Sequence, residues 1–172
     1  MRQGFTHVYT GNGKGKTTAA LGLALRAAGA GLKVYIGQFI KSAEYSEIKA
    51  LGRFKDQITL VQFGRGCFIR GTPCDADIEA ARNGLRALFD ALTSGAYDLV
   101  IADEANVAFG CGLITEEDLL GFMDARPAAV ELVLTGRGAP SAVIARADLV
   151  TEMVEVKHYY QRGILARDGI EK

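Results

Sequence analysis

The segment YTGNGKGKTT at residues 9–18 constrains the fold of this chain more than any other part of its sequence. Residues 5–10 before it read as a β-strand, and residues 17–28 (TTAALGLALRAA) form an alanine- and leucine-rich helical pattern that stops at Gly-Ala-Gly. Glycines allow the backbone between these elements to adopt positive φ values and to aim successive N–H groups at one point, beside the positive end of the helix dipole. We therefore expect the chain to open with the strand, loop and helix of an α/β protein.

The same alternation of strand and helix patterns continues to the end of the chain. Further strands are predicted at residues 33–40, 58–63, 99–102, 131–135 and 149–154, and helices at residues 44–51, 78–92 and 119–125 and from Ser141. Several strands are apolar throughout, which is typical of parallel strands covered on both faces. With 172 residues and no linker, repeat or charge block, the sequence predicts a single domain over residues 1–172, with a mostly parallel sheet and helices on both faces.

The charge balance and the cysteines indicate which partners and which cellular compartment to expect for the protein. Twenty Lys and Arg residues against twenty Asp and Glu residues give a net charge of zero, so no global field favours nucleic acid or an acidic membrane. The three cysteines, Cys67, Cys74 and Cys111, form no CxxC pair and leave one over in any disulfide scheme, which favours a reducing compartment. No apolar run approaches the ~18 residues of a membrane span. We expect a soluble, cytoplasmic protein that binds neither nucleic acid nor membrane.

The first loop carries the residue types of a phosphate-binding loop. The usual pattern is G-x-x-x-x-G-K-[ST], and this sequence has Thr10 in place of the first glycine, or is one residue short when counted from Gly11. Lys16 supplies a positive charge for phosphate oxygens, and the Thr17 hydroxyl stands where it can ligate Mg²⁺. A plain glycine-rich turn would not explain two lysines and two threonines in one loop. The residues predicted to cradle a nucleoside triphosphate are Gly11, Asn12, Gly13, Lys14, Gly15, Lys16, Thr17 and Thr18.

A pair of carboxylates follows the apolar strand at residues 99–102. Asp103 and Glu104 come at the carboxyl end of that strand, which is the edge where parallel α/β sheets bind ligands. Many strands end in an acidic residue that has no role, but a phosphate-binding loop in the same chain favours a Mg²⁺ or water-positioning role. Asp103 or Glu104 can therefore hold Mg²⁺, directly or through water, together with the Thr17 hydroxyl.

Other polar residues fall at the same predicted edge. Arg137 follows the strand at residues 131–135, where it can reach a phosphate, although a solvated turn arginine gives the same pattern. Gln38 and Lys41 lie at the end of the second strand. Arg26 is about two and a half turns into the first helix, where a surface position is the simplest interpretation.

These residues do not decide which bond of the triphosphate breaks, because kinases, ATPases, GTPases and some alkyl-type transferases share such loops. The sequence contains no guanine-reading Asn-Lys-x-Asp signature and no evident lid domain. Both observations disfavour a GTPase and a nucleotide kinase.

The chain resembles the P-loop-type ATP:corrinoid adenosyltransferases along nearly its whole length. The likeness begins with GNGKGKTTAALGLALRAAG at residue 11, whose loop is short in the same way as the family's. It continues through QFIK, FGRG, DEANVA, LTGRGAP, ADLVTEM and VKH to the closing GILARDGIE, which begin at residues 38, 63, 103, 134, 147, 156 and 163. The short loop together with LTGRGAP and ADLVTEM is far more specific than a phosphate-binding loop alone.

The resemblance implies a RecA-like P-loop fold, usually in a homodimer, and a defined reaction. The 5′-deoxyadenosyl group of ATP passes to the cobalt of a reduced corrinoid, cob(I)alamin or cob(I)yrinic acid a,c-diamide, and inorganic triphosphate leaves. Mg²⁺ is the implied cofactor, and an electron-donating flavoprotein reductase is an implied partner. Such a reaction requires the protein to orient carbon against cobalt and to stabilise a departing triphosphate, because cob(I) is already a strong nucleophile.

The resemblance also implies roles for individual residues. Lys16, Glu104 and Arg137 take catalytic positions, and Arg26 contacts the adenosine. The implied corrinoid-binding residues are Gln38, Lys41, Cys67, Phe68 and Ile69. Some family members carry Phe and Trp where this chain has Cys67 and Ile69, and some have an additional N-terminal segment that covers the site.

Two alternative functions are compatible with the residues themselves. One is a P-loop kinase or ATPase that cleaves the terminal phosphate of ATP, and the other is a non-catalytic nucleotide-binding or corrinoid-carrying protein. The products distinguish them, since adenosyl transfer releases triphosphate, phosphoryl transfer releases ADP and a binding protein releases neither.

Overall fold

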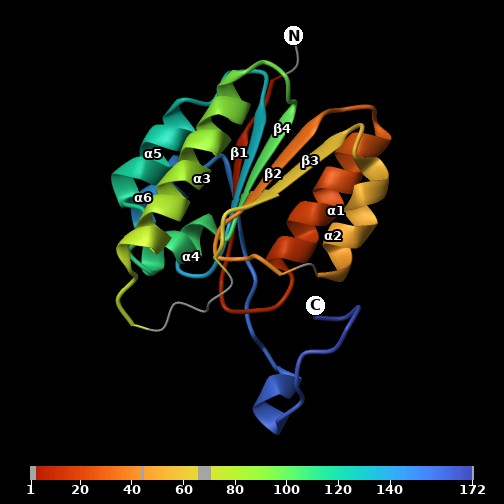
Figure 1. Cartoon of the computed structure of the whole chain (residues 1–172), viewed down its shortest axis with the longest axis vertical. Helices are drawn as coiled ribbons and strands as arrows, with labels where there is room; N and C mark the ends of the chain where they lie inside the picture. Colours follow the sequence, from red (N-terminus) through yellow and green to blue (C-terminus); the bar gives the residue numbers. More distant parts are fainter. Residues whose placement is uncertain (1–2, 44, 66–70, 172) are drawn as a thin grey trace.

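The computed structural model of this protein describes residues 3–43, 45–65 and 71–171, and it is built around a six-stranded sheet (Figure 1). The strands are β1 (Thr6–Thr10), β2 (Val34–Gln38), β3 (Ile58–Gln62), β4 (Leu99–Asp103), β5 (Glu131–Thr135) and β6 (Leu149–Glu152). Their order in the sheet is β3-β2-β4-β5-β1-β6, and every described pairing is parallel. The predicted α/β fold is confirmed, while Cys67, Phe68 and Ile69 lie outside the described residues.

Helices cover both faces of the sheet, as the sequence predicts. On one face lie α1 (Lys16–Gly29) and α2 (Ser46–Leu51), and on the other lie α3 (Asp75–Thr93), α4 (Ala105–Gly110), α5 (Glu116–Asp124) and α6 (Ser141–Arg146) (Figure 1). Short 3-10 turns occur at η1 (Gly52–Phe54) and η2 (Tyr159–Arg162). The sequence patterns do not predict α4, which begins directly after Glu104 with its left-handed φ of 61°.

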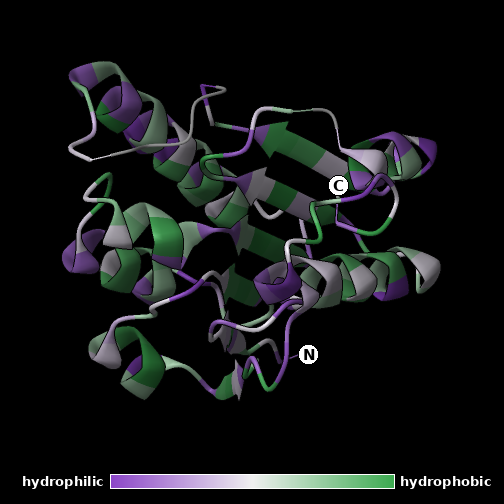
Figure 2. Ribbon diagram, turned by 90° about the horizontal axis from the view of Figure 1, so that it is seen from below, coloured by the Kyte–Doolittle hydropathy of each residue, from purple (hydrophilic) through white to green (hydrophobic). Residues whose placement is uncertain are grey.

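The central strands β2 and β4 are apolar because both of their faces are buried. β2 and β4 are buried along their whole length. Neighbouring residues of a strand point to opposite faces, so Ile101 packs in the cluster beneath α1 while Val100 packs in the cluster beneath α3 and α5. Figure 2 shows these hydrophobic strands between the two helical layers. Each fully buried side chain of this size contributes about 1.5–3 kcal/mol to folding, and together they fix the frame that carries the polar strand ends.

The carboxyl ends of the strands bring polar side chains into one row. Because the strands are parallel, Gln38 pairs with Asp103 on one side and with Gln62 on the other. Thr135 at the end of β5 pairs with Tyr9 near the end of β1. The loop after β1 and the carboxylates at the end of β4 therefore meet at the same edge of the sheet, separated by β5.

The chain after β6 leaves the sheet at this same edge. β6 lies at one side of the sheet, and all of its residues are exposed. Residues 153–171, which we call the C-terminal segment, extend beyond the carboxyl edge and return toward the first loop (Figure 1). Among the described helices, none is long and apolar enough to cross a membrane.

Candidate nucleotide-binding active site

The first loop folds around its own lysine. Gly11 and Gly15 have φ values of 92° and 120°, a region that glycine adopts without strain, and α1 begins directly afterwards at Lys16. The Lys16 ammonium donates 2.7 Å hydrogen bonds to the carbonyl oxygens of Gly11 and Gly13. Burial, and then the nearby charge of Arg137, lower the pKa of Lys16. The ammonium therefore lies over the loop, in a position from which it can neutralise a bound phosphate.

The glycines of this loop also make room for the C-terminal segment. A Cβ on Gly11 would lie 2.4 Å from the carbonyl oxygen of Met153, and a Cβ on Gly13 would lie 2.7 Å from it. The Gly13 N–H donates a 2.6 Å hydrogen bond to that same oxygen. Both positions therefore require glycine because a distant part of the chain approaches closely, a cause that the loop's own sequence does not reveal.

Asp103, at the end of β4, is the centre of a buried polar cluster. Its Oδ1 accepts hydrogen bonds from the hydroxyls of Thr17 and Thr135, at 2.9 and 2.7 Å. Its Oδ2 accepts from the Gln38 amide at 3.0 Å and from the Lys41 ammonium at 2.9 Å. A carboxylate has about four lone-pair sites, so these donors fill the acceptor capacity of Asp103.

Lys41 joins the first loop to this cluster. Its ammonium donates to the Thr17 hydroxyl oxygen at 3.2 Å as well as to Asp103. Burial acts to lower the pKa of Lys41, but the charge of Asp103 and the hydrogen bond to it outweigh burial and raise the pKa overall. Gln62 extends the cluster by donating to Gln38 at 3.0 Å. The structure thus places Gln38 and Lys41, the implied corrinoid contacts, against Asp103.

Glu104 follows Asp103 in an uncommon backbone conformation. Its φ is 61°, in the left-handed region that few non-glycine residues adopt. Its N–H donates a 3.0 Å hydrogen bond to the Thr135 hydroxyl oxygen, which helps to hold this conformation. Burial, and then the charge of Asp103, raise the pKa of Glu104, while three nearby cations act in the opposite direction. Glu104 is thus a largely buried carboxyl beside a second carboxylate.

The other predicted residues are more exposed. Arg137, in the turn after β5, is exposed and lies close enough to Lys16 to lower its pKa. Asn12 and Thr18 are exposed as well. Arg26 lies in the last turn of α1, ~15 Å along the helix from Lys16, and burial raises the pKa of Tyr9 in β1 while the charge of Arg26 acts to lower it.

Two buried residues belong to the site although the sequence analysis does not name them. The Thr135 hydroxyl contacts Asp103 and the backbone of Glu104 at once. Asn106 in α4 donates to the Gly136 carbonyl oxygen at 3.2 Å, and its Oδ1 has no hydrogen-bond partner in the described part of the chain. A threonine that ends a buried strand at the ligand-binding edge is a signal that could indicate Thr135, whereas no local pattern indicates Asn106.

Comparison with known proteins identifies the family. Residues 2–171 match the family described as ATP:corrinoid adenosyltransferase BtuR/CobO/CobP. The chain belongs to the ATP:corrinoid adenosyltransferase family. It is 37% identical over 170 residues to the corrinoid adenosyltransferase of Pseudomonas aeruginosa, an alignment that covers 98% of this chain and 84% of that protein. It is 34% identical to the corrinoid adenosyltransferase CobA of Salmonella typhimurium and 33% identical to the corrinoid adenosyltransferase of Escherichia coli, in both cases over 173 residues, 98% of this chain and 86% of the relative.

Membership of the ATP:corrinoid adenosyltransferase family confirms the resemblance seen in the sequence. The match extends over nearly the whole chain, so it includes the first loop, the carboxylates after β4 and the C-terminal segment. It favours a transferase over the kinase, ATPase and binding-protein alternatives.

The donor set of this adenosyltransferase site suits Mg²⁺. This cation takes oxygen ligands, usually one or two carboxylates together with water and substrate phosphates. Thr17 and Glu104 supply a hydroxyl and a carboxylate oxygen close to Asp103, whose own oxygens already accept four hydrogen bonds, and a divalent cation would stabilise the ionised form of the partly buried Glu104. The described residues contain no group of three or more His, Cys, Asp or Glu side chains that could hold a metal alone. The side chains of the described residues would therefore supply only part of the coordination shell of a cation here.

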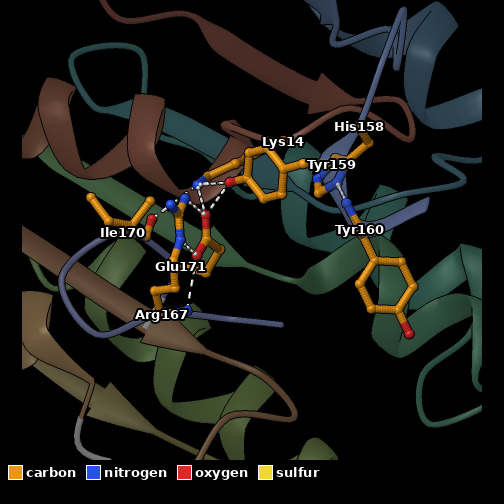
Figure 3. A network of polar contacts seen from close by, with 7 residues as sticks. All are labelled: Lys14, His158, Tyr159, Tyr160, Arg167, Ile170 and Glu171. Atoms are coloured by element: carbon orange, nitrogen blue, oxygen red, sulfur yellow. Dashed lines mark hydrogen bonds and ion pairs between the residues drawn. The ribbon is translucent and has the colours of Figure 1, made fainter. Parts of the chain in front are cut away.

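Lys14 of the adenosyltransferase loop points to the C-terminal segment (Figure 3). Its ammonium donates to the Tyr159 hydroxyl at 3.1 Å, to the Ile170 carbonyl at 3.0 Å and to Oε1 of Glu171 at 2.8 Å. Arg167 donates to Oε2 of Glu171 from its backbone N–H at 2.9 Å and from Nε at 3.2 Å. The structure thus connects Lys14, a residue predicted to bind the triphosphate, with the last turn of the chain.

Proposed function

We propose that this protein transfers the 5′-deoxyadenosyl group of ATP to the cobalt of a reduced corrinoid, cob(I)alamin or cob(I)yrinic acid a,c-diamide. The cobalt supplies the electron pair of the new cobalt–carbon bond, the bond between C5′ and its oxygen breaks, and inorganic triphosphate leaves with that bond's electrons. The observation that carries this proposal is the match to ATP:corrinoid adenosyltransferases over residues 2–171.

The polar cluster suits a reaction that needs charge stabilisation and no activated nucleophile. Asp103 accepts hydrogen bonds from four side chains, so it has no free lone pair with which to take a proton from an attacking group. Lys16 provides a fixed positive charge at the loop, and a preorganised charge of this kind stabilises a departing triphosphate. The bond from Thr17 to Asp103 fixes the start of α1, which helps to orient the reacting carbon.

Mg²⁺ is the proposed cofactor, with Thr17 and Glu104 as ligands and Asp103 close by. When bound, the cation would offset part of the negative charge of the triphosphate. Arg137 is a further proposed contact with phosphate or corrinoid, because it is exposed and lies beside Lys16.

The corrinoid is proposed to lie against the loop between β3 and α3. Cys67, Phe68 and Ile69 give that loop an apolar run, and a dry apolar surface would keep water away from the lower face of cobalt. Such a surface would allow a flavoprotein to reduce cob(II). We further propose a cytoplasmic homodimer that serves cobalamin synthesis or salvage, since three cysteines without a CxxC pair favour a reducing compartment.

An anaerobic assay with ATP, Mg²⁺ and chemically reduced cobalamin tests the proposal. The visible spectrum should change from that of cob(I)alamin to that of an alkylcobalamin, and phosphorus NMR should show inorganic triphosphate. ADP as the product would indicate phosphoryl transfer. Binding of ATP or corrinoid without any product would indicate a carrier protein.

A further inference from the structure

Lys14 and Lys16 belong to the same loop but bond to different parts of the chain. The Lys16 ammonium bonds to carbonyl oxygens of the loop itself. An ammonium has three N–H donors, and Lys14 directs its donors to Tyr159, Ile170 and Glu171 of the C-terminal segment. In this arrangement Lys14 has no donor left for a phosphate oxygen.

The C-terminal segment is fastened to the loop at two places. At its start, the Met153 carbonyl accepts the Gly13 N–H at 2.6 Å. At its end, Lys14 binds the last turn of the chain. Between these points the segment buries little apolar surface, and Val156, for example, is 92% exposed. Because hydrophobic burial contributes little here, the polar contacts at the two ends hold the segment in place.

Glu171 is the centre of the second attachment (Figure 3). Its carboxylate accepts from Lys14, from the Tyr159 hydroxyl and from the Arg167 backbone and side chain. Lys14 and Arg167 also lie over the Tyr159 ring, 5.8 and 5.1 Å from its centroid. Hydrogen bonds from Arg167 and Lys14 hold the pKa of Glu171 well below its usual value, so the carboxyl is ionised at neutral pH.

We propose that Lys14 anchors the C-terminal segment and does not bind phosphate, and that Glu171 is a positioning residue that acts on nucleotide binding through Lys14. This inference rests on the proposed function, because it takes residues 11–18 as the ATP site. The two attachments fix the course of the loop at Gly13 and Lys14 before ATP binds. If the segment is released, the loop must lose more conformational freedom on binding, and affinity falls.

The test compares MgATP binding by the full chain and its variants in isothermal titration calorimetry. The variants are Lys14→Met, Glu171→Gln and the double variant. Glu155→Gln is the matched control, because Glu155 is a carboxylate of the same segment that accepts a 2.7 Å hydrogen bond from Gln161 and does not contact Lys14. Circular dichroism confirms that each variant is folded.

A fluorescent reporter measures the mobility of the C-terminal segment independently of ATP binding. The chain has no tryptophan, so Tyr160→Trp, at a residue that is 68% exposed, places a single reporter in the segment. The substitution is made in the wild-type background and in each variant. Its fluorescence anisotropy should fall when Lys14→Met or Glu171→Gln releases the segment, and it should stay unchanged in the Glu155→Gln background.

We expect both single variants to weaken MgATP binding to the same extent, roughly two- to fivefold, as the loss of a partly exposed ionic network implies. The double variant should bind no more weakly than either single variant, because each change breaks the same anchor. The proposal is overturned if Lys14→Met weakens binding while Glu171→Gln binds as tightly as the wild type or more tightly. That result would show that Lys14 binds phosphate and that its contacts with the C-terminal segment compete with phosphate binding.

The same measurements separate this proposal from the proposed function. A wild-type protein that binds MgATP but yields no adenosylated product contradicts the adenosyl transfer alone, and the anisotropy and affinity comparisons still decide the role of Lys14. A wild-type protein that does not bind MgATP overturns both.

Discussion

Thr135→Val should destabilise the protein by far more than the loss of one hydroxyl usually costs. Thr135 is fully buried, and valine has almost the same shape, so the change removes the hydroxyl without opening a cavity. The hydroxyl donates to Asp103 Oδ1 at 2.7 Å and accepts from the Glu104 N–H at 3.0 Å. Valine therefore removes one donor from a buried carboxylate and leaves one backbone N–H without its partner.

The magnitude follows from these two contacts. A hydrogen bond to a charged group contributes about 1.5–3 kcal/mol, and a fully buried N–H that loses its partner costs about 1–3 kcal/mol, of which the part-buried Glu104 N–H incurs the lower end. The two losses share one oxygen and are not additive, so we expect a decrease of about 3 kcal/mol in the free energy of unfolding. For a domain of this size that corresponds to a Tm lower by roughly 6–12 °C.

Thermal unfolding followed by circular dichroism tests this expectation with matched variants. Thr135→Ser keeps the hydroxyl and should lose much less stability than Thr135→Val. Thr151→Val makes the same chemical change at an exposed position of β6 and should leave Tm nearly unchanged. The Thr135 hydroxyl does not stabilise the cluster as expected if Thr135→Val unfolds at the wild-type temperature, or if Thr135→Ser is destabilised as much as Thr135→Val.

Four further outcomes follow from the site. Lys16→Ala should leave the fold intact and lower kcat by about 10²–10³, the range for one preorganised charge-stabilising donor. Normal adenosylation by this variant would contradict the assignment of Lys16 to the triphosphate site. Glu104→Gln should weaken the Mg²⁺ dependence of turnover more than Asp98→Asn, because Asp98 bonds to a backbone N–H at the opposite edge of the sheet; equal Mg²⁺ titrations would contradict this. Phe68→Ala should spare adenosylation of chemically prepared cob(I) and impair the reaction from cob(II) with a flavin reductant, and equal loss of both reactions would place the corrinoid elsewhere. The folded-state pKa of Glu171 is below its ordinary value of 4.5, so the stabilisation that its carboxylate gives the attached C-terminal segment is complete above pH 4.5 and is lost as the pH falls below it. Reporter anisotropy should therefore be constant from about pH 8 to about pH 5 and decrease only under more acid conditions.

The fold could be predicted from the sequence because its signals are local. Apolar runs between glycine-rich turns mark the strands, and the helical repeat of residues 78–92 marks α3, although element ends differ by a few residues. α4 was not predicted because it begins after Glu104, whose left-handed φ of 61° no residue preference predicts.

The sequence predicts which residues belong to the site only where a residue can be assigned to the end of a strand. Lys16, Thr17 and Asp103 fall at the carboxyl edge on sequence pattern alone. Their contacts depend on which strands are neighbours, and β5 lies between β1 and β4 although it follows both in the chain. That order brings Thr135 to Asp103, which is 32 residues away in the sequence. The bond from Lys14 to Glu171 joins residues 157 positions apart, a distance over which a single sequence carries no pairing signal.

Folding and catalysis draw on the same buried contacts in this protein. Asp103 is fully buried, and a buried charge is tolerated only when its hydrogen bonds are complete. Two of the four residues that complete them also set the position of a functional group: Thr17 lies at the start of α1, and Thr135 accepts from the backbone N–H of Glu104. A substitution in this cluster therefore lowers stability and displaces the ligand-binding groups together. Variants of the cluster report on catalysis only when their folded fraction is measured alongside turnover, and a conservative change such as Thr135→Ser separates the two effects because it preserves the hydrogen bonds while altering the packing.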